Sequence, residues 1–228
     1  MASQSLDQMR LPFAQSSHDR ENLIISDENR DVHQALEGWD GRPDPYLVLV
    51  GGHGTGKSHF GAVWASEAGA ARIVPYSLAD LPLDALSDIC GAAVFLDDAD
   101  RLRDESALFH LLNLIVQKKG RLLMTAQTVP SLWTATLPDL VSRLAAIRCL
   151  HLRQPDDATL SELLRRAASR RGLALDDATR KVILTRMERS FDAVASFIDA
   201  FDGELTRRPG ASPSTLARRA MAALYPER

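Results

Sequence analysis

The stretch Gly51–Ser58 reads GGHGTGKS and has the G-x-x-x-x-G-K-[ST] spacing of a phosphate-binding loop. Its glycines let consecutive backbone N–H groups curl around phosphate oxygens, and a following helix would add the positive end of its dipole. Lys57 would reach the β- and γ-phosphates, and the Ser58 hydroxyl would ligate Mg²⁺. A chance glycine-rich turn is the alternative. We predict an ADP or ATP site that includes Gly51, Gly52, His53, Gly54, Thr55, Gly56, Lys57, Ser58 and His59.

A second motif supplies acids. Residues 93–98 read AVFLDD, an apolar run that ends in two carboxylates. With the phosphate loop present, Asp97 is expected to hold Mg²⁺ together with Ser58, and Asp98 occupies the position of a base that orients water. A strand that ends in a polar turn is the alternative interpretation.

Strands and helices must alternate to position these motifs. Short apolar runs predict strands over Tyr46–Val50, Arg72–Tyr76, Ala92–Leu96, Arg121–Thr125 and Ile147–Leu152. Helical spacing is found over Ser58–Ala68 and Glu105–Lys119. Apolar strands that alternate with helices predict an α/β fold, with a parallel sheet covered on both faces.

The pattern changes at Pro155, beyond which no strand is predicted. Helices are expected over about 157–171, 177–188 and 190–207, and Ser212-Pro213 opens a last one with Ser as N-cap and Pro at the first helical position. We therefore expect a tail of residues 1–17, an α/β domain of residues 18–154 and an all-helical domain of residues 155–228.

Composition limits the class of protein. Of 228 residues, 45% are hydrophobic and 25% charged, which suits a globular protein, and the net charge of −3 argues against coating duplex DNA by charge alone. Cys90 and Cys149 lie among apolar residues outside any metal-ligand spacing and are expected to be reduced core thiols. Without a signal peptide or an apolar run long enough to span a bilayer, we expect a cytoplasmic protein with no membrane partner.

Together the motifs resemble AAA+ ATPases, and in detail the ATPase module of the replication initiator DnaA. Glu21–Leu36 resembles the segment that leads into the initiator's adenine pocket, Val94–Leu102 its Walker B region and Leu137–Leu144 its arginine-finger box. The resemblance covers residues 18–226 and implies a P-loop AAA+ sheet followed by a helical lid.

Three departures narrow the resemblance. The chain ends at Arg228, where the initiator continues into a helix-turn-helix domain, so sequence-specific binding of duplex DNA is not expected. Only residues 77–91 separate the second and third strands, where the initiator carries a helical insertion. An N-terminal QMRLPF, residues 8–13, precedes the module. This combination resembles the Hda-type regulators of replication initiation.

The QMRLPF segment is similar to peptides that bind the β sliding clamp of DNA polymerase III. The resemblance implies that Gln8 hydrogen-bonds at one edge while Leu11 and Phe13 fill an apolar cleft. Pro12 would reduce the conformational entropy that is lost on binding. The alternative is that Leu11 and Phe13 fold back onto the ATPase domain.

The resemblance also implies roles for single residues. Gln127 matches sensor I, with a loop-capping amide as the alternative, and Arg143 matches an arginine finger that acts in a partner subunit's ATP site. An ion pair with Asp139, four residues earlier, is the alternative for Arg143. Where the family carries the sensor II arginine, this chain has Asp192; Arg189 could substitute, and we assign no sensor II residue. The lid arginines are expected to form a solvated face, with contact to DNA or to the initiator as the alternative: Arg165, Arg166, Arg170 and Arg171.

Two functions remain open from the sequence. The first is a clamp-tethered regulator with weak intrinsic ATPase activity, which stimulates ATP hydrolysis by DnaA and prevents re-initiation of DNA replication. The second is a stand-alone ATPase that resembles the helicase loaders. Whether the chain is itself an enzyme and whether it forms homo-oligomers are not decided by the sequence.

Overall fold

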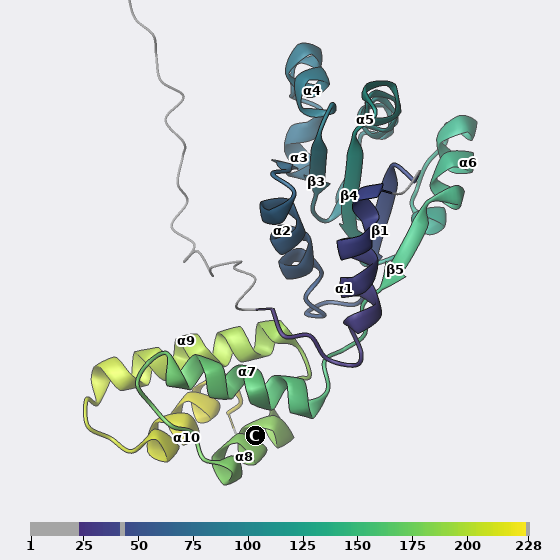
Figure 1. Cartoon of the computed structure of the whole chain (residues 1–228). Helices are drawn as coiled ribbons and strands as arrows, with labels where there is room; N and C mark the ends of the chain where they lie inside the picture. Colours follow the sequence, from purple (N-terminus) through teal and green to yellow (C-terminus); the bar gives the residue numbers. More distant parts are fainter. Residues whose placement is uncertain (1–22, 42–43, 227–228) are drawn as a thin grey trace, which may run out of the picture.

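The computed structural model describes residues 23–41 and 44–226 (Figure 1). The predicted clamp-binding residues Gln8, Leu11, Pro12 and Phe13 lie outside these described residues. Within the described part, five strands form one parallel sheet in the order β2-β3-β4-β1-β5. They are β1 (Tyr46–Val50), β2 (Ala71–Ile73), β3 (Ala93–Leu96), β4 (Arg121–Ala126) and β5 (Arg148–His151).

Helices cover both faces of the sheet, as its apolar strands require. Side chains alternate along β1, so Leu47 and Leu49 pack with Trp39 and Trp64 on one face, while Val48 faces the other. The first face is covered by α1 (Arg30–Glu37) and α2 (Lys57–Glu67). The second is covered by α4 (Leu83–Ile89), α5 (Glu105–Lys118) and α6 (Pro138–Ala146). The predicted α/β fold is confirmed.

Some sequence expectations were wrong in detail. The strand predicted over Arg72–Tyr76 ends at Ile73, because Pro75 opens the short helix α3 (Pro75–Leu78) with its fixed φ. Helices α1 and α4 and the 3₁₀ turn η2 (Gly38–Gly41) were not predicted. Cys90 is a buried thiol, as expected, whereas Cys149 is only half-buried.

Four helices form a separate layer after the sheet, called the lid below (Figure 1). They are α7 (Asp157–Ser169), α8 (Asp177–Arg186), α9 (Phe191–Arg207) and α10 (Pro213–Leu224). Each begins at an N-cap side chain that accepts a hydrogen bond from the N–H three residues later: Asp156, Asp176, Ser190 and Ser212. The lid has its own apolar core, which includes Leu164, Ile183, Phe197, Phe201 and Leu216. In the described part of the chain, no helix combines the length and apolarity that crossing a bilayer demands.

Candidate nucleotide-binding site

The phosphate loop lies between β1 and α2, as its motif predicts. Gly54 and Gly56 have φ values of +67° and +90°, a left-handed conformation that favours glycine. A Cβ atom on Gly54 would lie 2.4 Å from the Cβ of Ser190, so the lid packs directly against this loop. The loop therefore needs glycine at position 54 both for its backbone conformation and for the close approach of the lid.

Lys57 is the buried cation of the loop. Its Nζ donates to the Gly52 carbonyl at 2.8 Å, and Thr55 Oγ1 donates to the same oxygen at 3.0 Å. Burial lowers the pKa of Lys57, while the nearby carboxylates, led by Asp98, act in the opposite direction. A phosphate would offer this ammonium a charged partner in place of a neutral carbonyl, and hydrogen bonds to charged partners are the stronger ones.

The two predicted magnesium ligands lie together. Ser58 Oγ donates to Asp97 Oδ1 at 3.0 Å, and the Thr125 hydroxyl donates to the same oxygen. A hydroxyl beside a carboxylate suits Mg²⁺, which prefers oxygen ligands and keeps several waters or phosphate oxygens. Among the described residues, no group of three or more His, Cys, Asp or Glu could hold a metal ion alone. The residues therefore fit Mg²⁺ that arrives with a nucleotide rather than an independent metal site.

Asp98, the predicted base, is held at an unusual backbone position. Its φ of 51° is left-handed, a conformation that costs a non-glycine residue about 1 kcal/mol or more. Its N–H donates to Thr125 Oγ1 at 2.8 Å, and its carboxylate forms an ion pair with Arg101 at 3.2 Å. The carboxylate is therefore engaged by a cation from its own chain.

Gln127 lines the same cavity as Asp98. Its backbone N–H donates to Asp100 Oδ2 at 2.8 Å, which joins the end of β4 to the 3₁₀ turn η3 (Ala99–Arg101). This connection between the two loops uses the backbone of Gln127. Gln127 therefore lies at the cavity, and its role as sensor I stays a prediction.

A cavity of about 580 Å³ lies between the phosphate loop and the lid. Its size is that of an ordinary small-ligand pocket. Leu23 and Ile24 line it from the entry segment, and His53, Lys57, Ser58 and His59 line it from the loop and the start of α2. The lid contributes Leu163, Arg166, Ala167, Arg170, Phe191, Asp192 and Ala195. The sheet domain and the lid thus share one site.

The start of α9 makes the direct contact between lid and loop. The Phe191 N–H donates to the Gly54 carbonyl at 2.8 Å, and Asp192 Oδ2 lies 3.4 Å from His53 Nδ1. Arg189, which could have substituted for sensor II, instead pairs with Asp157 at 2.9 Å and is not among the residues that line this cavity. The α9 start therefore brings an acid to the nucleotide cavity, and Arg189 does not replace the missing arginine there.

Arg143 lies at the other end of the sheet. Its NH1 donates to Asn113 Oδ1 at 2.7 Å, and its guanidinium lies 5.4 Å from the centre of the Phe109 ring. It is also close to Tyr46, whose pKa is raised by burial and lowered in part by this arginine. Tyr46 begins the five-residue strand β1, and the phosphate loop follows its other end, about 16 Å away at the usual rise per residue. The guanidinium faces α5 rather than Asp139, and it lies outside its own chain's nucleotide cavity.

Three arginines line the cavity without having been assigned to it from the sequence: Arg101, Arg166 and Arg170. Arg166 and Arg170 were expected on a solvated face of the lid. Arg101 follows Asp98 by three residues, a spacing at which ion pairs form on a helical turn. Arg166 and Arg170 are four residues apart on one helix, so they share a face. These spacings could have identified both features, but they do not show what the face contacts.

Comparison with known proteins supports the fold. Domain III of DnaA from Thermotoga maritima superposes with a TM-score of 0.75 at 15% identity, over 93% of this chain and 98% of that one. AMPPCP-bound DnaA from Aquifex aeolicus gives a TM-score of 0.66 at 19% identity, over 83% of this chain. This chain spans 66% of the length of the Aquifex protein. The Holliday junction branch migration motor RuvB of Thermotoga maritima gives 0.68 at 22% identity, over 89% and 71% of the two chains.

Comparison of the sequence alone with known proteins does not identify a family for this chain. An uncharacterized protein of Haemophilus influenzae is 29% identical over 192 residues, which cover 79% of this chain and 80% of that protein. No protein-family model matches the chain. The structural likeness confirms the predicted fold: a parallel α/β sheet with a C-terminal helical region, similar to domain III of DnaA.

Proposed function

We propose that this protein is a nucleotide-binding regulator of replication initiation of the Hda type. It binds the β sliding clamp through residues 8–13 and stimulates ATP hydrolysis by the initiator DnaA. The observation that carries the proposal is the position of Arg143, at the opposite end of β1 from the chain's own phosphate loop. An arginine so placed can serve a phosphate site only in another chain.

The loop geometry and the DnaA-like fold support binding of ADP or ATP. The Aquifex DnaA neighbour is AMPPCP-bound, and AMPPCP is an analogue of ATP. Lys57 and the loop N–H groups would hold the phosphates, and Ser58 and Asp97 would hold Mg²⁺ beside them. The bound ion would supply positive charge that offsets the charge of the phosphates.

The surroundings of two acids at the cavity, Asp98 and Asp192, favour weak intrinsic hydrolysis. Asp98 Oδ2 is paired with Arg101, which therefore competes with water for that carboxylate oxygen. Asp192 adds a negative charge to the lid side of the cavity. Both features oppose turnover within the chain and leave binding possible.

Stimulation of the initiator would depend on the guanidinium of Arg143. In phosphoryl transfer an arginine supplied by a neighbouring chain stabilises charge on the transferred group and is worth roughly 10³–10⁵ in rate. To act so, Arg143 must leave Asn113 and Phe109, which costs about one charged hydrogen bond and one cation–π contact. The surface of the initiator would provide the compensating contacts.

A stand-alone ATPase remains the second candidate, because the RuvB motor superposes as well as some DnaA chains do. The two candidates differ in what the purified protein does alone. A motor or loader turns over ATP without a partner and responds to single-stranded DNA, whereas the proposed regulator does neither.

The test measures hydrolysis of ATP bound to DnaA, with and without clamp-loaded DNA and this protein. We expect stimulation only when the protein and the loaded clamp are both present. Leu11→Ala combined with Phe13→Ala should abolish the stimulation without changing the melting temperature. Equal stimulation by this double variant would contradict clamp binding through residues 8–13, and a failure of the wild-type protein to stimulate would contradict the regulator itself.

A further inference from the structure

Helix α7 and its C-terminal end carry two pairs of consecutive arginines. One pair is Arg165 and Arg166, and the other is Arg170 and Arg171. In each pair one member lines the nucleotide cavity, namely Arg166 and Arg170, and the other does not. Each pair therefore has one arginine at the cavity wall and one away from it, and the contacts of the two can be compared.

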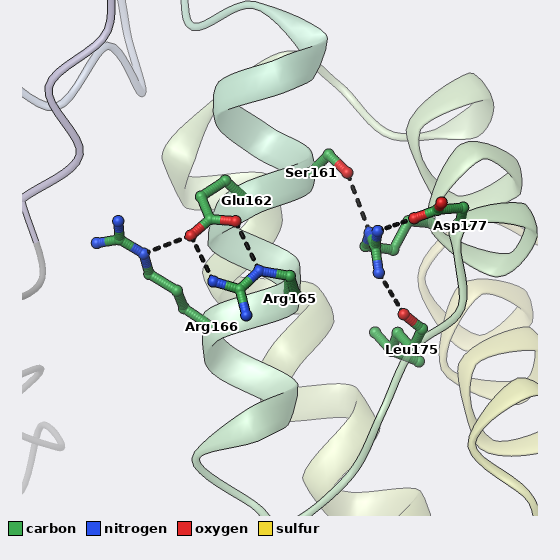
Figure 2. Close-up of polar contacts among 7 residues, drawn as sticks. Ser161, Glu162, Arg165, Arg166, Leu175 and Asp177 are labelled. Atoms are coloured by element: carbon green, nitrogen blue, oxygen red, sulfur yellow. Dashed lines mark hydrogen bonds and ion pairs between the residues drawn. The ribbon is translucent and has the colours of Figure 1, made fainter.

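Arg165 and Arg171 each bind both oxygens of a carboxylate. Arg165 donates through Nε and NH2 to both oxygens of Glu162, each at 2.7 Å (Figure 2). Arg171 donates through Nε and NH2 to the two oxygens of Asp202 and through NH1 to the Ala167 carbonyl at 2.9 Å. The Arg171 contact joins the end of α7 to α9, on which Asp202 lies, whereas the Arg165 contact stays within α7.

Arg166 and Arg170 keep unused donors. Arg166 donates only through Nε, to Glu162 Oε1 at 2.8 Å, and Figure 2 shows its terminal nitrogens pointing away from that carboxylate. Within the described part of the chain, those nitrogens have no hydrogen-bond partner, and neither does the side chain of Arg170. Two guanidinium groups thus offer free N–H groups at the wall of the cavity.

The free donors of Arg166 and Arg170 matter for phosphate binding because the rest of the lid brings negative charge to the cavity. The lid contributes one acid to the cavity wall, Asp192, at the start of α9. That acid lies 3.4 Å from His53 and faces the loop that would hold the phosphates. Positive charge from the lid therefore comes from α7 and not from α9. A planar guanidinium matches the geometry of phosphate oxygens and is the common choice for binding them.

We propose that Arg166 and Arg170 bind the phosphate groups of the nucleotide, so that the first helix of the lid supplies the contacts that the start of α9 cannot. This inference rests on the proposed function, in which the cavity holds ADP or ATP. Lys57 on the sheet domain and the two arginines on the lid would then hold the same phosphates. Bound nucleotide thereby fastens the lid to the sheet domain.

The test is a titration with ADP and Mg²⁺ by calorimetry. Arg166→Ala and Arg170→Ala should each weaken binding of ADP about tenfold, and the double variant more than either. Arg165→Ala is the matched control, since it removes an arginine that shares Glu162 but does not line the cavity, and it should bind within about twofold of wild type. Arg171→Ala serves in the same way for Arg170, provided that thermal melting shows an intact lid.

A second ligand identifies the group that is contacted. AMP has one phosphate, so the preference for ADP over AMP should shrink in both cavity variants and stay unchanged in Arg165→Ala. If Arg166→Ala and Arg170→Ala bind ADP like wild type, or lose ADP and AMP equally, the proposal is wrong while the nucleotide site stands. If wild type binds no ADP, or Lys57→Ala binds it equally well, the nucleotide site itself is wrong and this proposal with it.

Discussion

The two ends of the parallel sheet are built differently. At the carboxyl end, the phosphate loop, Asp98 and Gln127 surround an open cavity, and arginines of the lid keep free donors there. At the amino end, the guanidinium of Arg143 is packed between Asn113 and Phe109. One end is ready for a ligand, and the other must rearrange to meet one. The difference teaches that the phosphate loop and Arg143, the two groups on which the proposed function depends, lie too far apart in one chain to act on the same phosphate.

The largest expected effect comes from a substitution that removes phosphate binding at the carboxyl end and leaves the amino end unchanged. Lys57→Ala removes the buried cation that would hold the phosphates, so we expect at least a hundredfold loss of ADP affinity and no loss of stability without nucleotide. The measurement is the rise in melting temperature with ADP and Mg²⁺. Lys118→Ala, an exposed lysine on α5, is the control. A rise in Lys57→Ala equal to that of wild type would show that the loop does not hold the phosphates.

The contact between loop and lid is next in size. Gly54→Ala forces a left-handed alanine and places its Cβ 2.4 Å from Ser190, so unfolding free energy should fall by about 1–3 kcal/mol. Urea denaturation measures this fall. Gly91→Ala is the control, because a Cβ there meets nothing within 4 Å. Equal stability of the two variants would mean that the lid does not press on the loop.

A change at the amino end should cost less. Asn113→Ala removes the hydrogen-bond partner of Arg143 and keeps the guanidinium, so we expect a loss of about 1 kcal/mol in urea and unchanged ADP binding. This variant separates the packing of Arg143 from its charge. A large change in ADP affinity would contradict the separation of the two ends.

The smallest expected effect concerns the contact between the start of α5 and the segment that precedes α6. Glu105 at the start of α5 accepts from the hydroxyl and N–H of Thr136, just before α6, and the hydroxyl is the larger cause of its lowered pKa. A lowered folded-state pKa adds stability above the ordinary value of 4.5, and this stability is lost as the pH falls through the folded-state value. Because Glu105 is exposed, the effect is small. Melting temperatures against pH should fall less steeply on the acid side in Glu105→Gln, and identical curves would count against this contact.

The sequence predicted the features that depend on neighbouring residues. The loop from Gly51 to Ser58 and the acids after β3 were found because strand, turn and helix follow one another directly in the chain. The partners of charged side chains were not found, since they come from distant segments. Asn113 lies 30 residues from Arg143, and the cavity side of Arg166 depends on how the lid packs on the sheet domain. The residues 8–13 that led to the clamp prediction lie outside the described structure, so that prediction stays untested.

The most direct test of the account compares three variants in the hydrolysis of DnaA-bound ATP, with clamp-loaded DNA present throughout. The account predicts that Arg143→Ala loses most of the stimulation and that Arg143→Lys, which keeps the charge but not the planar fork, recovers little of it. Asn113→Ala, which disturbs the same packing but keeps the guanidinium, should stimulate at least as well as wild type. If Arg143→Ala stimulates like wild type, or if Asn113→Ala fails to the same extent as Arg143→Ala, the arginine only holds α6 against α5 and the central claim is wrong.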